Sequence, residues 1–271
     1  MKNEKLKELL EIAVRAGVEA GNAVCEVYNK DFDVEFKDDK SPLTLADKNA
    51  NKIIESYLDK TGFPVLSEEG RDIPYEERKK WDYFWMVDPL DGTKEFVKRN
   101  GEFTVNIAFI HNGTPLLGVV VAPVLKDLYF ASGQTGSVKV ENISMVDSFL
   151  TGLDELIKAG NRLPVDNGED VFRVVGSKSH MTKETEDYIK ELEKDHKNIE
   201  IISKGSSLKI CMVAEGYADV YPRFAPTMEW DTAAGHAIVK YANGKVLNHE
   251  TGSPVVYNKE NLLNPWFLVS R

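Results

Sequence analysis

The sequence lacks the features that mark disulfide-rich and nucleic-acid-binding proteins. It has only two cysteines in 271 residues, Cys25 and Cys211, and both lie in apolar stretches with helical spacing. We therefore expect two buried thiols, and neither a disulfide nor a cysteine metal site. There is also no run of basic residues, and the net charge of −10 argues against a nucleic-acid partner. An anionic substrate would need bound metal ions to reverse the charge locally.

Long apolar runs are also missing. The longest one, from Leu116 to Pro123, is too short to cross a bilayer, so we expect no transmembrane segment. The first ten residues carry acids and lysines through the region that a signal peptide would keep apolar. We therefore expect a protein of the cytoplasm, with peripheral attachment to the inner face of the cell membrane as the alternative. The oligomeric state stays open.

The composition, 42% apolar and 29% charged, is that of a globular protein with one large domain or two ordinary ones. A polar stretch around 148–168 predicts an N-terminal α+β half, residues 1–150, and a C-terminal α/β half, residues 151–271. Turn residues between the apolar runs of 103–131 indicate an antiparallel meander. Periodicity predicts helices over 3–28, 45–60, 183–196, 208–215 and 231–241, and strands over 34–36, 63–66, 84–87, 103–110, 115–124, 127–131, 172–175, 199–202 and 219–221.

One stretch, residues 84–93, indicates a functional site. A buried apolar strand ends at Asp88, Asp91 and Thr93, with a proline and a glycine in the same turn. These polar side chains can converge at the carboxyl end of the strand, where open α/β sheets bind ligands. Two carboxylates so close repel each other unless a cation lies between them. The pattern therefore favours a hard divalent metal bound by both aspartates and by the carbonyl of Leu90.

Each acid also has an ordinary structural explanation. The residues 88–93 form an Asp-Pro turn, and Asp47 fits a capping box that begins at Thr44. The pair Glu68-Glu69 fits a solvated acidic pair, and Asp231 fits a helix N-terminus, where the dipole favours an acid. These explanations account poorly for the joint pattern, in which acids repeatedly follow an apolar strand or lie at the start of a helix.

Taken together, these blocks resemble the lithium-sensitive, magnesium-dependent inositol monophosphatase superfamily. The resemblance rests on Thr44–Asp47, Ser67–Glu69, Asp88–Thr93 and Trp230–Ala234, and it extends from residue 5 to about 250. The nearer match is the bacterial 3′(2′),5′-bisphosphate nucleotidase branch. That match is carried by Asp88–Phe96, Asn100–Asn106, Gly205–Lys209 and Tyr221–Phe224. The resemblance implies an α/β (α+β) fold, a five-layered αβαβα sandwich with the site between the two halves.

The resemblance also implies a metal site and a mechanism. Glu68, Asp88 and the Leu90 carbonyl would bind one Mg²⁺, and Asp88, Asp91 and Asp231 a second, with a weaker third ion near Glu68. Asp47 and Thr93 would orient and deprotonate the attacking water, so the implied catalytic residues are Asp47, Thr93 and Glu68. Mn²⁺ would substitute for Mg²⁺, whereas Li⁺ and Ca²⁺ would inhibit.

The implied reaction is hydrolysis of the 3′-phosphate of adenosine 3′,5′-bisphosphate to AMP and phosphate, with 3′-phosphoadenylyl sulfate as a related substrate. This would recycle the by-product of sulfate activation in sulfur metabolism. The alternatives are a phosphatase of the same superfamily that acts on inositol phosphates or fructose 1,6-bisphosphate, and a catalytically silent binding protein on the same fold. The implied substrate-binding residues are Glu68, Leu90, Asp91, Gly92, Thr93, Ser177, His180, Gly205, Lys209 and Asp231.

Several residues of the second half keep two interpretations. Ser206 fits a helix N-cap, Lys209 a solvated lysine and His180 a hydrogen-bonded loop residue, as well as contacts to a nucleotide. Arg223 fits a phosphate clamp or an ion pair with Glu229.

Overall fold

The computed structural model describes residues 1–29, 34–36, 42–143, 152–165, 171–176 and 181–271. The described helices are α1 (Asn3–Tyr28), α2 (Leu45–Leu58), the 3₁₀ helix η1 (Asp59–Thr61), α3 (Tyr75–Arg78), α4 (Thr93–Val97), α5 (Leu153–Ala159), α6 (Lys183–Leu192), α7 (Leu208–Glu215) and α8 (Glu229–Tyr241). The described strands are β1 (Val34–Phe36), β2 (Pro42–Thr44), β3 (Val65–Ser67), β4 (Tyr83–Asp91), β5 (Thr104–His111), β6 (Thr114–Ala122), β7 (Asp127–Ser132), β8 (Gly136–Val140), β9 (Asn161–Arg162), β10 (Phe172–Val175), β11 (Ile199–Ile202), β12 (Val220–Arg223), β13 (Lys245–Asn248) and β14 (Phe267–Ser270).

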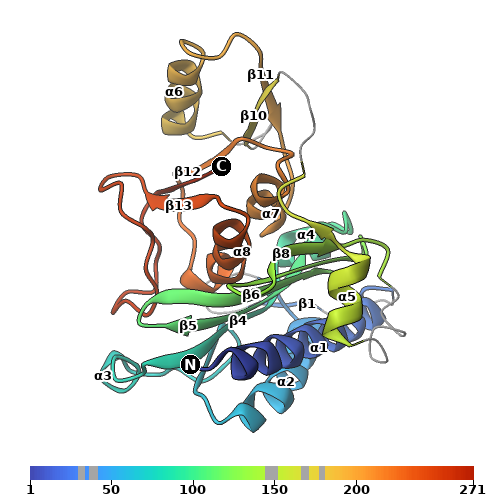
Figure 1. Cartoon of the computed structure of the whole chain (residues 1–271). Helices are drawn as coiled ribbons and strands as arrows, with labels where there is room; N and C mark the ends of the chain where they lie inside the picture. The colour runs from blue at the N-terminus through green and yellow to red at the C-terminus, as the bar shows by residue number, and fades with distance from the viewer. Residues whose placement is uncertain (30–33, 37–41, 144–151, 166–170, 177–180) are drawn as a thin grey trace.

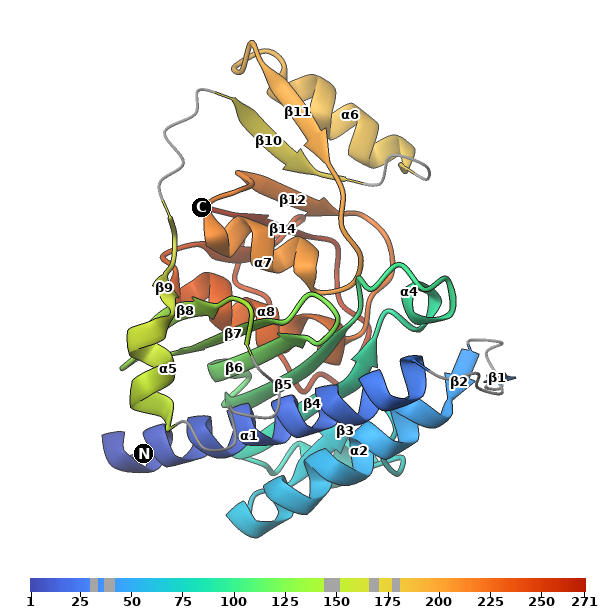
Figure 2. The same ribbon diagram turned by 90° about the vertical axis from the view of Figure 1, so that its right-hand side faces the viewer.

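Two large sheets alternate with helices in the order that the resemblance implied (Figure 1). Helices α1 and α2 lie side by side on the outer face of a seven-stranded sheet (Figure 2). Helices α7 and α8 fill the space between this sheet and a five-stranded sheet, and α6 covers the far face of the second sheet. The predicted αβαβα sandwich is therefore confirmed.

The first sheet has the strand order β3-β4-β5-β6-β7-β8-β9, and only β3 and β4 among these neighbours run parallel. The antiparallel meander predicted for β5, β6 and β7 is confirmed. The second sheet has the order β11-β10-β12-β14-β13, in which β10 runs parallel to both of its neighbours. The proposed division of the chain near residue 150 stays a prediction.

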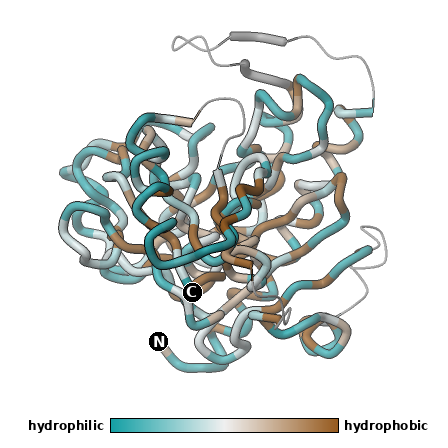
Figure 3. The backbone as a smooth tube through the Cα atoms, turned by 90° about the horizontal axis from the view of Figure 1, so that it is seen from above, coloured by the Kyte–Doolittle hydropathy of each residue, from teal (hydrophilic) through white to brown (hydrophobic). Residues whose placement is uncertain are grey.

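The core consists of apolar layers on both faces of the first sheet. On one face, α1 presents apolar and small residues at three- and four-residue spacings, among them Leu9, Leu10 and Ala13, all fully buried. On the other face, α8 lies so close to β6 that a Cβ added at Gly118 would be 2.4 Å from the carbonyl oxygen of Ala234. Figure 3 shows hydrophobic positions concentrated in the interior segments.

Five regular elements within, beyond or just before the polar stretch were not predicted. These are α5, β9, β13 and β14, together with β8 just before that stretch. They are short, and the edge strand β9 has two exposed residues, so neither periodicity nor burial distinguishes it from a loop. In the described part of the chain, no helix is both long enough and apolar enough to span a membrane.

Candidate active site

Strand β4 places two carboxylates at its carboxyl end. Its apolar residues from Phe84 to Val87 are at most 1% exposed, so the strand is rigidly packed up to Asp88, itself 1% exposed. The pairing of β4 with β5 becomes irregular between Asp88 and Asp91, where a proline interrupts the ladder. Asp88 Oδ1 accepts a hydrogen bond from the Leu90 N–H at 3.1 Å. The predicted turn therefore holds both aspartates at one site.

Two further acids reach this turn from neighbouring elements. Glu68 directly follows β3, which runs parallel to β4, and its N–H donates to the Val87 carbonyl at 3.1 Å. Asp47 lies in the first turn of α2, is 2% exposed, and is held there because α2 packs on β4. The parallel pairing of β3 and β4 thus brings Glu68 beside Asp88.

The fifth acid comes from the other half of the chain. Asp231 lies in the first turn of α8, and its Oδ2 accepts a hydrogen bond from the Met228 N–H at 2.9 Å. Burial, followed by the charge of Asp91, raises its pKa to about 8. Asp231 therefore both occupies the N-terminal turn of a helix, as one explanation expected, and lies close to the acids of β4.

The electrostatics show that the five carboxylates share one environment. Burial raises the pKa of Asp88 well above its usual range, and the charges of Glu68, Asp91, Asp231 and Asp47 raise it further. Burial also raises the pKa of Asp91. Buried like charges are costly unless a cation compensates them, so this donor set suits a hard divalent ion with oxygen ligands.

Three of the five carboxylates accept hydrogen bonds from protein donors. Among the described residues, no three His, Cys, Asp or Glu side chains form a group tight enough to hold a metal ion. Asp88, Asp91 and Asp231 instead accept the hydrogen bonds of Leu90, Ser207 and Met228. The metal-ligand assignment therefore stays a prediction.

Ser207 connects the acids of the two halves. Its Oγ lies 2.9 Å from Asp91 Oδ2 and 2.7 Å from the Asp231 carbonyl oxygen, and it accepts a hydrogen bond from Asn106 Nδ2 at 2.9 Å. Ser207 and Asn106 lie in two of the blocks that carry the resemblance, and Ser207 was expected to open a helix whose N-terminus attracts a phosphate. Only their contacts across more than one hundred residues of sequence, 116 for Ser207 and Asp91, show that they support the site.

The turn after β4 also touches the second half. Gly92 has φ of +92°, a conformation that favours glycine, and a Cβ there would lie 3.1 Å from Ser206 Cβ. Thr93 is the first residue of α4 and is half-buried. Gly92 therefore allows the loop before α7 to approach the acidic turn.

The predicted substrate-binding residues of the second half differ in where they lie relative to the acids. The Gly205 N–H donates to Glu102 Oε2 at 2.8 Å, and a Cβ at this position would lie 2.5 Å from the Glu102 carbonyl oxygen. Gly205 is therefore required by packing, and its N–H is already used. Lys209 is close enough for its charge to oppose the rise in the pKa of Asp91. Ser177 and His180 lie outside the described residues.

Two local expectations were wrong. The N-cap of α7 is Ser207, not Ser206, and its side chain makes no capping bond because it faces the acids. Glu229 is fully buried and forms its ion pair with Lys259, not with Arg223. Both errors concern partners that are distant in sequence.

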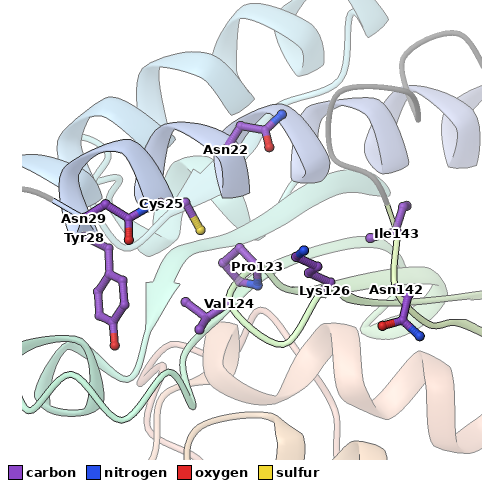
Figure 4. Close-up of a pocket in the computed structure, with 9 residues that line it drawn as sticks. All are labelled: Asn22, Cys25, Tyr28, Asn29, Pro123, Val124, Lys126, Asn142 and Ile143. Carbon is purple, nitrogen blue, oxygen red and sulfur yellow. The ribbon is translucent and has the colours of Figure 1, made fainter.

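A large cavity lies apart from the acidic site. It has a volume of about 490 Å³ and lies between the end of α1 and the β6–β7 turn (Figure 4). Its lining residues are Asn22, Cys25, Tyr28, Asn29, Pro123, Val124, Lys126, Asn142 and Ile143. None of them is a predicted site residue, and burial raises the pKa of the Cys25 thiol to about 11, so that thiol is not a nucleophile at neutral pH.

Comparison with known proteins supports the resemblance inferred from the sequence blocks. The chain is 45% identical over 257 residues to the 3′(2′),5′-bisphosphate nucleotidase CysQ of Shigella flexneri, covering 93% of this chain and 95% of that protein. It is 43% identical over 268 residues to the protein of the same name from Salmonella typhimurium, covering 97% and 99%.

A solved structure shows the same fold. The crystal structure of CysQ from Bacteroides thetaiotaomicron, described as a bacterial member of the inositol monophosphatase family, superposes with a TM-score of 0.90. The two proteins share 50% sequence identity, and the match covers 97% of each chain. The sequence model of the inositol monophosphatase family matches residues 5–266 of this chain. The chain belongs to the inositol monophosphatase family.

Proposed function

We propose that this chain is a Mg²⁺-dependent phosphomonoesterase that hydrolyses the 3′-phosphate of adenosine 3′,5′-bisphosphate to AMP and phosphate. Its related substrate is 3′-phosphoadenylyl sulfate. The observation that carries the proposal is a group of five carboxylates in which Asp47 and Asp88 are buried and the charges of the other four raise the pKa of Asp88. The names of the relatives that are 43% and 45% identical support the choice of substrate.

Members of the inositol monophosphatase family generally use Mg²⁺ for phosphatase activity. In the proposal, Glu68, Asp88 and the Leu90 carbonyl would hold one ion, and Asp88, Asp91 and Asp231 would hold a second, with two or three ions in all. Bound Mg²⁺ supplies positive charge that attracts phosphoryl oxygens and lowers the pKa of water. Mn²⁺ substitutes, and Li⁺ and Ca²⁺ inhibit, Ca²⁺ because it does not reproduce the tight octahedral geometry of Mg²⁺.

The residues of the chain position the water and the substrate. Asp47, in the first turn of α2, and Thr93 together orient and deprotonate the attacking water, and the Thr93 hydroxyl relays the proton toward the Asp47 carboxylate. Glu68 completes this catalytic set from the end of β3. The substrate contacts Glu68, residues 90–93 and Asp231, and Ser177, His180, Gly205 and Lys209 bind the adenosine or its 5′-phosphate. The proposal also includes a location in the cytoplasm and a nucleotide bisphosphate as the small-molecule partner.

Initial rates measured with Mg²⁺ test the proposal. Adenosine 3′,5′-bisphosphate is expected to give a kcat/KM well above those of inositol 1-phosphate and fructose 1,6-bisphosphate. Equal rates on inositol 1-phosphate would replace the nucleotide assignment with another phosphatase of the same family. No hydrolysis of any of the three, with Mg²⁺ binding retained, would identify a catalytically silent binding protein.

A further inference from the structure

The segment between β13 and β14 is bound to the first turn of α8. Residues 257–264 of this segment belong to no helix or strand, yet their backbone and side chains make hydrogen bonds to that turn. The Glu229 N–H donates to the Leu262 carbonyl at 2.9 Å. The Asn264 N–H donates to the Thr227 carbonyl at 2.8 Å. The turn that carries the fifth acid is therefore held by a segment that lies outside both sheets.

Asn264 holds the residue whose N–H binds the Asp231 carboxylate. Its Nδ2 lies 2.7 Å from the Met228 carbonyl oxygen, 3.2 Å from Thr227 Oγ1 and 3.0 Å from Thr232 Oγ1. A carbonyl oxygen can only accept, so the group that faces Met228 is the amide nitrogen. The Met228 N–H in turn donates to Asp231 Oδ2 at 2.9 Å. Asn264 Oδ1 has no hydrogen-bond partner among the described residues, so this side chain acts there through Nδ2.

A buried carboxylate, that of Glu229, fixes the same segment on α8. Glu229 is fully buried and accepts hydrogen bonds from the N–H groups of Asn258 and Lys259 and from Lys259 Nζ. A buried charge is costly unless it is paired, and the ion pair with Lys259 provides the partner. Because successive residues of an α-helix are about 100° apart around its axis, Glu229 and Asp231 lie on opposite sides of α8. Glu229 therefore holds the turn from the side opposite to Asp231.

The first half of the chain reaches this segment through Arg78, the last residue of α3. Arg78 is 4% exposed and donates to the Asn258 side-chain oxygen at 3.0 Å. It also donates to the carbonyls of Lys259 and Glu260 at 2.6 and 2.7 Å, and Asn258 Nδ2 donates back to the Arg78 carbonyl at 2.7 Å. Figure 1 shows the segment after β13, in red, descending toward α3. A chain of contacts therefore runs from α3 through residues 257–264 to the N-terminus of α8.

Asp231 lies at the end of this chain of contacts. Its side chain accepts from Met228, and its carbonyl oxygen lies 2.7 Å from Ser207 Oγ, which also contacts Asp91. The turn is thus held by residues 257–264 and, separately, by Ser207. An ion binds tightly where its ligands are already in place, so contacts that fix a ligand contribute to metal affinity without touching the ion.

We propose that Glu229 and Asn264 are positioning residues, which keep Asp231 in place to bind a divalent cation together with the acids of β4. They act through the first turn of α8 rather than by contact with the cation or the substrate. This inference rests on the proposed function, since it takes Asp231 as a ligand of the second Mg²⁺. Loss of either side chain therefore weakens Mg²⁺ binding more than it slows the reaction at saturating Mg²⁺.

The test measures Mg²⁺ affinity in two variants with matched controls. For Glu229→Gln and Asn264→Ala, we expect the Mg²⁺ concentration that gives half-maximal hydrolysis of adenosine 3′,5′-bisphosphate to rise about tenfold, with a far smaller change in kcat at saturating Mg²⁺. Calorimetric titration of the metal-free proteins with Mg²⁺ should show the same weakening without any turnover. Two controls should behave as the wild type: Glu215→Gln, which breaks the ion pair with Lys139, and Asn261→Ala, at an exposed position of the same segment.

The outcomes separate this inference from the proposed function. A variant that is merely less stable keeps the wild-type Mg²⁺ affinity at temperatures where it is folded, so an unchanged affinity in either variant would overturn the role of that residue. A wild-type enzyme whose hydrolysis does not depend on Mg²⁺ would overturn the proposed function and this inference with it. Should Glu229→Gln fail to fold, Lys259→Gln removes the same ion pair at a side chain that is 28% exposed. Wild-type Mg²⁺ affinity in Lys259→Gln would then contradict the inference.

Discussion

Ser207 and Asp91 join the two halves of the molecule at the site, with 2.9 Å between Oγ and Oδ2. Ser207 Oγ accepts from Asn106 and has a single proton, so it donates either to Asp91 or to the Asp231 carbonyl, which is 2.7 Å away. This one hydroxyl therefore orients an acid of β4 relative to the first turn of α8.

Replacement of Ser207 by alanine tests this positioning. We expect Ser207→Ala to lower kcat/KM about tenfold and the free energy of unfolding by about 1–3 kcal/mol, because Asn106 is left unsatisfied. Ser137→Ala is the matched control, since Ser137 Oγ is buried and has no hydrogen-bond partner among the described residues. Activity assays and urea unfolding measure both effects. Wild-type kcat/KM in Ser207→Ala would exclude a positioning role.

Asp91 tests the predicted metal cluster. We expect Asp91→Asn to lose Mg²⁺-dependent activity by about 100-fold or more, because a metal ligand contributes several kcal/mol. The rise of Tm on addition of Mg²⁺ should also shrink, while the metal-free variant should be no less stable, because one buried charge is gone. Asp59→Asn, at an exposed position in η1, is the control. Full turnover of Asp91→Asn would refute the metal assignment.

The close approach of α8 to β6 depends on Gly118. In Gly118→Ala the new methyl group would lie 2.4 Å from the Ala234 carbonyl oxygen and would push α8, and with it Asp231, away from the sheet. We expect a loss of stability of about 1–3 kcal/mol together with reduced activity. In Gly133→Ala the nearest atom, on Tyr241, is 3.5 Å away, so this control should fold normally. Thermal unfolding of the two variants gives the comparison, and equal Tm values would contradict the packing argument.

His236 makes the stability depend on pH. Burial lowers its pKa from 6.5 to about 3, with a smaller effect from Lys240, and its Nδ1 lies 2.9 Å from the Tyr257 hydroxyl. Below pH 6.5 the unfolded chain binds a proton there that the folded protein does not, so this contribution to stability falls as the pH falls.

The matched measurement uses His236→Asn. We expect the stability of the wild type relative to this variant to decrease between pH 7 and about pH 4, and to be constant above pH 7. Unfolding free energies at several pH values provide the test. A difference that does not change with pH would show that His236 is protonated in the folded state or remains neutral in both states.

Much of the architecture was predictable because local periodicity reports burial. The elements α1, α7 and β11 begin and end where the sequence predicted them. The short elements of 136–162 and the last two strands were not predictable, because a strand of two to five residues is stabilised by its neighbours in the sheet rather than by its own pattern.

For the site, the sequence by itself determined the local chemistry. The placement of Asp88 and Asp91 at the end of a buried strand, and the prediction of a cation that follows from it, depend on residues a few positions apart. Only the tertiary structure decided that Asp231 and Ser207 lie close to that strand end. The contacts of Ser207 reach Asp91 and Asn106 of the first sheet, and the packing of α7 and α8 between the sheets, which sets those distances, leaves no short-range signal in the chain.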